Sequence, residues 1–230
     1  MKQLILISLF IIFSIITSSA QSQELHQPTD DFLSYRLEKV GNLKDGKEEG
    51  KWIVYYVDKK TGKRVGVMEK GKYEKGEKVG KWSTFYLNGN VESKKKFKQG
   101  EANGEFIEYH ENGNIESKTN FVNGEVNGIV KSYYEDGNLY SIERYDYGTR
   151  VGEWLYFYEN GKIRDKYSYR DGKIDGDWFH YTKEGLLDYK LIFKVGLKLE
   201  KIKYDSNGVI VSQEVFNRIE SVKKNSLRRF

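Results

Sequence analysis

Residues 148–171 read GTRVGEWLYFYENGKIRDKYSYRD, and the same arrangement of residues recurs through most of the chain. Two stretches rich in Tyr, Phe and Trp flank the dipeptide Asn160-Gly161 in this segment. Asn-Gly between two such stretches is a strong hairpin signal, because the turn requires positive φ angles. A helix is disfavoured, since each interior glycine would cost about 1 kcal/mol. The segment therefore predicts one β-hairpin.

Aligned glycines and aromatics indicate that this hairpin is copied in tandem with a period of 24 residues. The glycine columns are Gly76, Gly100, Gly124, Gly148, Gly172 and Gly196; Gly80, Gly104, Gly128, Gly152 and Gly176; and Gly89, Gly113, Gly137, Gly161 and Gly185. Two aromatic columns are Phe85, Tyr109, Tyr133, Phe157 and Tyr181, and Phe97, Phe121, Tyr145, Tyr169 and Phe193. Such self-similarity predicts a repeat architecture. We expect an all-β fold in which tandem antiparallel β-hairpins form one elongated, twisted meander sheet of about fourteen strands.

A further column, two residues after the second glycine, holds all four tryptophans of the chain. Its members are Trp52, Trp82, Phe106, Val130, Trp154 and Trp178. One interpretation is a structural ladder, because stacked rings can hold together a sheet that lacks a second layer. The other is that the aromatic members, Trp52, Trp82, Phe106, Trp154 and Trp178, line an exposed binding groove. Since Trp82 and Phe85 are three residues apart, aromatics should line both faces of the sheet.

The register of each hairpin stays open at this point. A two-residue turn at Asn88-Gly89 would place Phe97 opposite Gly80, on the tryptophan side of the sheet. A three-residue loop with a bulge at Gly89 would instead group Phe85, Val91 and Phe97.

The repeat pattern and the sequence of the two ends divide the chain into four segments. Residues 1–20 combine a short positive start, an apolar run from Leu4 to Ile16 and small residues before Gln21, which predicts a cleaved signal peptide. The apolar run is shorter than the ~20 residues that span a bilayer, so no integral membrane segment is expected after cleavage. We predict a linker over 21–34, the repeat array over 35–216 and a basic tail or short cap over 217–230. The expected location is secreted, periplasmic or in the cell envelope.

Composition excludes several kinds of chemistry. The absence of cysteine excludes disulfides, thiolate metal sites and thiol catalysis. The three histidines, His26, His110 and His180, lack a metal-ligand spacing, and we interpret His110 and His180 as surface strand residues. The net charge of +5 includes no basic block interleaved with aromatics, so no nucleic-acid partner is expected. No metal site and no cofactor is predicted.

Carboxylates next to the tryptophan column were considered as catalytic groups. A spaced pair among Glu105, Glu153 and Asp177 could in principle cleave a glycosidic bond, which would make the protein a hydrolase. However, a charged residue that flanks Trp in an alternating strand belongs on the solvent face, and a catalytic site should break the repeat symmetry. The sequence therefore predicts no catalytic residue and a protein that is not an enzyme.

One unit, Tyr145-x-x-Gly148-x-x-x-Gly152-x-Trp154-x-x-Phe157-x-x-Asn160-Gly161, resembles the consensus of the bacterial MORN-repeat variant family. The resemblance covers about residues 41–216, although Val130 departs at the tryptophan column and the last unit lacks its Gly and Trp. It implies a MORN-like solenoid that acts as a non-enzymatic scaffold. Members of this family are often labelled antitoxin components of toxin–antitoxin pairs. A cytoplasmic antitoxin role is at odds with the predicted export.

The resulting functional hypothesis is an exported, non-enzymatic scaffold that binds a protein or an envelope component through an aromatic-lined groove of the sheet. The motivating feature is the large number of aromatics on a sheet that has no second layer. One alternative is a glycan- or cell-wall-binding module whose tryptophans stack on sugar rings. Another is an antitoxin-like protein that binds a partner toxin.

Overall fold

The computed structural model describes residues 34–216, which form a single open sheet of 18 strands. The strands are β1 (Tyr35–Lys44), β2 (Lys47–Asp58), β3 (Arg64–Glu74), β4 (Glu77–Phe85), β5 (Val91–Lys98), β6 (Glu101–Tyr109), β7 (Ile115–Val122), β8 (Glu125–Val126), β9 (Gly128–Tyr133), β10 (Leu139–Asp146), β11 (Thr149–Arg150), β12 (Gly152–Phe157), β13 (Ile163–Arg170), β14 (Lys173–Ile174), β15 (Gly176–Tyr181), β16 (Leu187–Lys194), β17 (Leu197–Tyr204) and β18 (Ile210–Val215). All ladders between them are antiparallel, as in β3–β4 and β4–β5. The predicted all-β meander of tandem hairpins is thereby confirmed.

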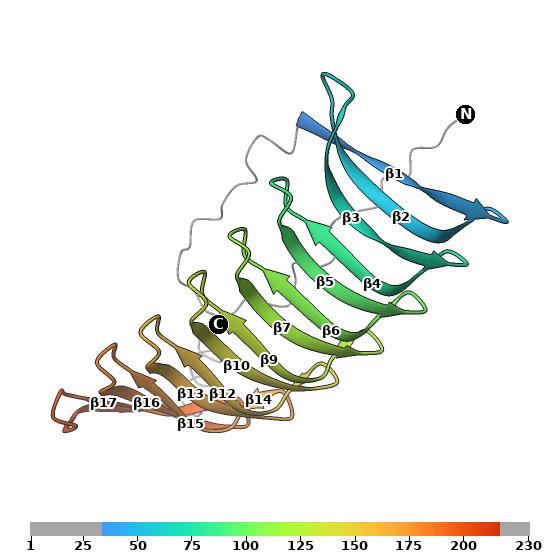
Figure 1. The fold of residues 1–230 in the computed structure, drawn as a ribbon. Helices are drawn as coiled ribbons and strands as arrows, with labels where there is room; N and C mark the ends of the chain where they lie inside the picture. The colour runs from blue at the N-terminus through green and yellow to red at the C-terminus, as the bar shows by residue number, and fades with distance from the viewer. Residues whose placement is uncertain (1–33, 217–230) are drawn as a thin grey trace, which may run out of the picture.

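Each hairpin arm is bent, so the sheet is curved across its strands and twists along its length (Figure 1). Three arms are each divided into a short and a longer strand next to a glycine, which gives β8 and β9, β11 and β12, and β14 and β15. The predicted signal peptide (1–20), all but one residue of the predicted linker (21–34) and the predicted tail (217–230) lie outside the described residues.

The turns between successive hairpins have two residues at positive φ. Between β5 and β6, Lys98 pairs with Glu101 and leaves Gln99 (φ 50°) and Gly100 (φ 79°) in the turn. Positive φ at both central positions defines a type I′ turn, whose twist matches that of the flanking strands. The first position is tolerant of residue type, since Val195 adopts φ 49° there despite its branched Cβ.

The Asn-Gly turns within each hairpin have a different geometry. The Tyr86 amide donates to the Asn90 carbonyl at 2.9 Å, which encloses a three-residue loop in which Gly89 has φ 91°. The Asn88 side chain accepts a hydrogen bond from the Asn90 amide at 2.8 Å and stabilises the loop. Phe85 consequently lies opposite Val91, as the three-residue interpretation predicts.

A second irregularity restores the pairing that the two-residue turn predicts. One extra residue, Glu92, is inserted between the pairs Phe85–Val91 and Thr84–Ser93. Beyond this bulge Gly80 lies opposite Phe97, whose ring is 6.4 Å from that of Trp82. Each interpretation was therefore correct at one end of the hairpin, and the expected grouping of Phe97 with Phe85 was wrong.

The inserted residue recurs in every hairpin, and it occupies a column of varied chemistry. Its members are Met68, Glu92, Glu116, Tyr140, Arg164, Asp188 and Val211. A β-bulge redirects a side chain and increases the local twist, so this column can differ between units without disturbing the repeat.

The packed interior is a line of aromatic rings along one face. In the N-terminal part the rings of Trp52, Tyr73 and Trp82 form edge-to-face pairs with centroids 5.8 and 4.9 Å apart. The indole of Trp82 lies directly on Gly71, where an added Cβ would approach the ring to 2.1 Å. Trp52 covers Gly41 in the same way. The ladder of stacked rings is thus part of the observed structure.

Candidate functional site

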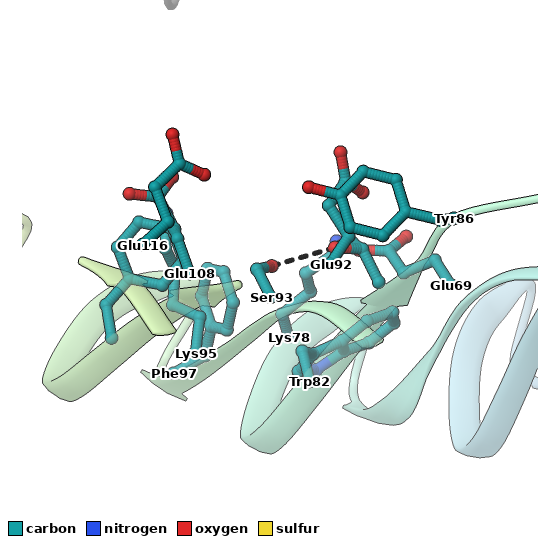
Figure 2. Close-up of a pocket in the computed structure, with 12 residues that line it drawn as sticks. Glu69, Lys78, Trp82, Tyr86, Glu92, Ser93, Lys95, Phe97, Glu108 and Glu116 are labelled. Carbon is teal, nitrogen blue, oxygen red and sulfur yellow. Dashed lines mark hydrogen bonds and ion pairs between the residues drawn. The ribbon is translucent and has the colours of Figure 1, made fainter. Parts of the chain in front are cut away.

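Alternation along the strands separates an inner face, which carries the tryptophan column, from an outer face. In β4, for example, Trp82 and Thr84 belong to the inner face, and Ser83 and Phe85 to the outer face. Figure 2 shows Trp82, Phe97 and Lys95 gathered on the same side of the curved strands, within their bend. We call this inner face, over the length of the sheet, the trough.

A row of polar side chains follows the trough from β3 to β17, parallel to the tryptophan column. The row consists of Glu69, Thr84, Ser93, Glu108, Ser117, Ser132, Ser141, Tyr156, Asp165, His180, Tyr189 and Lys203, each opposite the next. This row was not predicted from the sequence. Its signal was the recurrence of Ser93, Ser117 and Ser141 at the 24-residue period, which had meaning only once the register was known.

The trough contains a hollow of about 370 Å³ over β4–β7 (Figure 2). Its walls combine an aromatic floor, two lysines, several hydroxyls and four glutamates. The lining residues are Glu69, Lys78, Trp82, Thr84, Tyr86, Glu92, Ser93, Lys95, Phe97, Phe106, Glu108 and Glu116. Two of the glutamates, Glu92 and Glu116, belong to the bulge column and are exposed.

Two lysines lie on the aromatic floor of the hollow. Lys78 forms an ion pair with Glu69, and its Nζ is 4.0 Å from the centroid of Trp82. Lys95 Nζ is 4.0 Å from the centroid of Phe106, and no described carboxylate forms an ion pair with it. Burial lowers the pKa of the Lys95 ammonium from its usual value. Cations over ring faces are attracted by the ring quadrupole, so this floor is suited to positive charge.

The pKa of Tyr86 reflects the negative charge at the rim of the hollow. Its hydroxyl donates to the Tyr109 carbonyl at 2.6 Å. Burial raises the pKa of Tyr86 to about 12, and the negative charges of Glu116, Glu92, Glu111 and Glu108 add to the effect. Several carboxylates therefore converge at one edge of the hollow, where a positively charged group of a ligand would be favoured.

The equivalent part of the trough near β13–β16 is filled by its own side chains. Asp165 accepts hydrogen bonds from His180 Nδ1 at 2.7 Å, Trp178 Nε1 at 3.0 Å and Arg164 Nε at 2.7 Å. Burial alone would raise the pKa of Asp165, but these hydrogen bonds outweigh it and hold the pKa below its usual value. Both oxygens of this carboxylate accept hydrogen bonds from the protein itself.

His110 and His180 are part-buried and hydrogen-bonded, so the prediction of surface positions is wrong; His180 lies in a strand as predicted, whereas His110 follows the end of β6. His180 is part-buried in the Asp165 network and stacks on Tyr189 with centroids 4.6 Å apart. His110 Nε2 bonds the Tyr133 carbonyl at 2.9 Å. The phenols of the corresponding residues in other units bond the next unit in the same way, as Tyr86 does.

The five predicted binding residues lie along the trough, and three of them are buried. The exposed fractions of Trp52, Trp82 and Trp154 are 7%, 2% and 4%. Phe106 and Trp178 are half-buried, and only Trp82 and Phe106 line the hollow. The packing role of this column is visible in the structure, whereas its binding role stays a prediction.

Within residues 34–216, no group of His, Cys, Asp and Glu side chains is arranged to hold a metal ion. The same residues include no helix that is long and apolar enough to cross a membrane.

Comparison with known families gives a match that coincides with the hairpin units. The model of the family described as MORN repeat variant matches residues 78–99, 102–123, 126–147 and 150–171. No curated protein shows significant similarity to the chain.

Proposed function

Because this chain contains four tandem repeats of the MORN repeat variant family, we propose that it is an exported, non-enzymatic scaffold that binds a partner protein through the trough. The observation that carries the proposal is the hollow over β4–β7, which has an aromatic floor and a rim of carboxylates. An interface of this kind uses aromatic anchors for affinity and charged rim groups for orientation and specificity.

The charges of the hollow specify the chemistry of the partner. Glu92 and Glu116 are exposed and form no ion pair with a described residue. The two lysines below them, Lys78 and Lys95, already lie over the floor rings. The partner therefore presents lysine or arginine side chains to the exposed carboxylates of the rim.

Affinity capture from envelope extracts, with quantification of each retained protein, tests this function. The wild type is compared with Glu92→Gln/Glu116→Gln, which removes two charges from the rim. The matched control is Glu105→Gln/Glu153→Gln, which removes two carboxylates from the outer face. A partner retained by the wild type and the control but lost from the rim variant supports the proposal. Retention that does not differ among the three proteins contradicts it.

Export is tested separately by fractionation of the native producer and by N-terminal sequencing of the protein. The proposal predicts an envelope or secreted fraction whose first residue is Gln21. A cytoplasmic protein that retains residues 1–20 would contradict export and would favour the antitoxin-like alternative.

A further inference from the structure

The outer face of the sheet carries a row of side chains that the trough does not use. In register order this row is Lys70, Ser83, Lys94, Ile107, Lys118, Lys131, Ile142, Leu155, Lys166, Phe179 and Lys190. Lysine occupies the same repeat position in Lys70, Lys94, Lys118, Lys166 and Lys190, with Ile142 as the exception. Equivalent positions are two strands apart, so the backbone positions of these lysines recur about every 10 Å along the sheet.

In the C-terminal half these lysines are neutralised by carboxylates on the neighbouring strand. Lys166 Nζ is 2.8 Å from Glu153, and Lys190 Nζ is 3.3 Å from Asp177. The partner in each case precedes the lysine by 13 residues. The repeat geometry therefore allows an ion pair wherever an acid occupies that position.

In the N-terminal half the equivalent lysines of this row, Lys70, Lys94 and Lys118, form no ion pair with a described carboxylate. The residue that precedes Lys94 by 13 positions is another lysine, Lys81. Glu105 occupies that position relative to Lys118, but no ion pair joins the two. Among the described residues, no carboxylate forms an ion pair with any member of a group that we call the lysine surface: Lys70, Lys81, Lys94, Lys96, Lys118 and Lys131.

Two pairs within the lysine surface lie directly opposite one another. Lys118 pairs with Lys131, and Lys81 pairs with Lys96. Like charges that face each other across strands destabilise a sheet. The arrangement therefore costs stability in the isolated protein, and an external polyanion would remove this cost.

We propose that the lysine surface binds an acidic polysaccharide that lies across the strands of the N-terminal half. A glycan with one acidic group per disaccharide has charges spaced widely along its chain, as the lysines are. Nucleic acid is disfavoured, because its phosphates recur about every 3.4 Å along each strand, roughly three times more densely than the lysines. The ring faces that bases would need are also covered, since Lys70 lies over Phe85 and Lys94 over Tyr109.

The experiment is calorimetric titration of the full chain with hyaluronan oligosaccharides, which carry one carboxylate per disaccharide, at low and at physiological ionic strength. Neutral dextran, oligothymidylate and phosphatidylglycerol vesicles are the comparison ligands. The variant Lys94→Gln/Lys118→Gln is compared with Lys166→Gln/Lys190→Gln, because all four lysines occupy the same repeat position and each variant loses two charges.

The expected result is salt-sensitive binding to hyaluronan, without binding to dextran. Lys94→Gln/Lys118→Gln should weaken the affinity for hyaluronan about tenfold at low salt, because a complex with two fewer charge contacts releases fewer counterions. The control variant should bind as the wild type does. The rim variant Glu92→Gln/Glu116→Gln should also bind hyaluronan normally, so this proposal and the trough function fail independently.

Several outcomes would overturn the proposal. These are no binding to hyaluronan, equal weakening in the two lysine variants, or tighter binding to oligothymidylate or vesicles than to hyaluronan. Thermal unfolding of both variants serves as the folding control. Lys94→Gln/Lys118→Gln is expected to melt at or above the wild-type temperature, because it removes the charge of Lys118, which lies directly opposite Lys131.

Discussion

The two halves of the sheet share one repeat and differ in how far their polar groups are satisfied internally. Around β13–β16 the trough is filled by stacked rings, with Tyr167 and Trp178 only 4.3 Å apart, and by the Asp165 network. Around β4–β7 the trough is hollow, and the exposed carboxylates of Glu92 and Glu116 lie at its rim. Among the equivalent lysines of the outer face, Lys166 and Lys190 are paired with carboxylates, whereas Lys94 and Lys118 are not. Groups that are satisfied internally stabilise the fold, which is why we propose binding at the half where they are not.

The largest effect is expected when the ladder under the hollow is broken. Trp82→Ala should lower the free energy of unfolding by about 3–5 kcal/mol, because it removes a buried indole and leaves a cavity on Gly71. Chemical denaturation provides the measurement, and Leu87→Ala, at an exposed loop position, is the control. A cost below about 1 kcal/mol would show that the column is not a structural ladder and would restore it as a binding surface.

An intermediate effect is expected from the Asp165 network. Asp165→Asn should cost about 2–3 kcal/mol, because three donors lose a buried carboxylate. Glu92→Gln, in the exposed rim of the other half, should change stability by less than about 0.5 kcal/mol. If the two variants lost the same free energy of unfolding, the two halves would not differ in how far their carboxylates stabilise the fold.

The same network predicts a pH dependence. The pKa of Asp165 is lowered in the folded state. The ionised carboxylate therefore contributes fully to the free energy of unfolding above its unfolded-state pKa of about 3.9, and this contribution is lost as the pH falls through the folded-state pKa. Denaturation curves of the wild type and Asp165→Asn should therefore differ at neutral pH and converge in strong acid. A difference that persists unchanged in acid would mean that the ionised carboxylate is not the stabilising species.

The smallest effect concerns the bonds between consecutive units. His110→Tyr should restore the phenol found at Tyr86 and Tyr134, and should raise stability by about 0.5–1 kcal/mol. The reverse change in the second half, Tyr134→His, should lower stability by a similar amount. If both substitutions act in the same direction, the position is not equivalent in the two halves. Thermal unfolding at pH 7.5 provides the measurement.

The candidate site was only partly predictable from the sequence. Of the two interpretations of the tryptophan column, the structural ladder is visible in the buried rings of Trp52, Trp82 and Trp154, whereas the binding groove stays a prediction. The hollow was not identified, because its rim glutamates occupy the bulge, and one inserted residue changes which side chains reach the inner face. The lysine surface was not predicted for a similar reason, since the neighbours of Lys94 and Lys118 became known only with the register.

Local chemistry alone determined the hairpin, its 24-residue copies and the all-β class, because positive-φ glycines and alternating aromatics act over a few residues. Only the tertiary structure decided which columns share a face, because a shift of one residue reverses every side chain of a strand. The loop after Tyr86 and the bulge at Glu92 set that register together. The trough, its hollow and the lysine surface all follow from it.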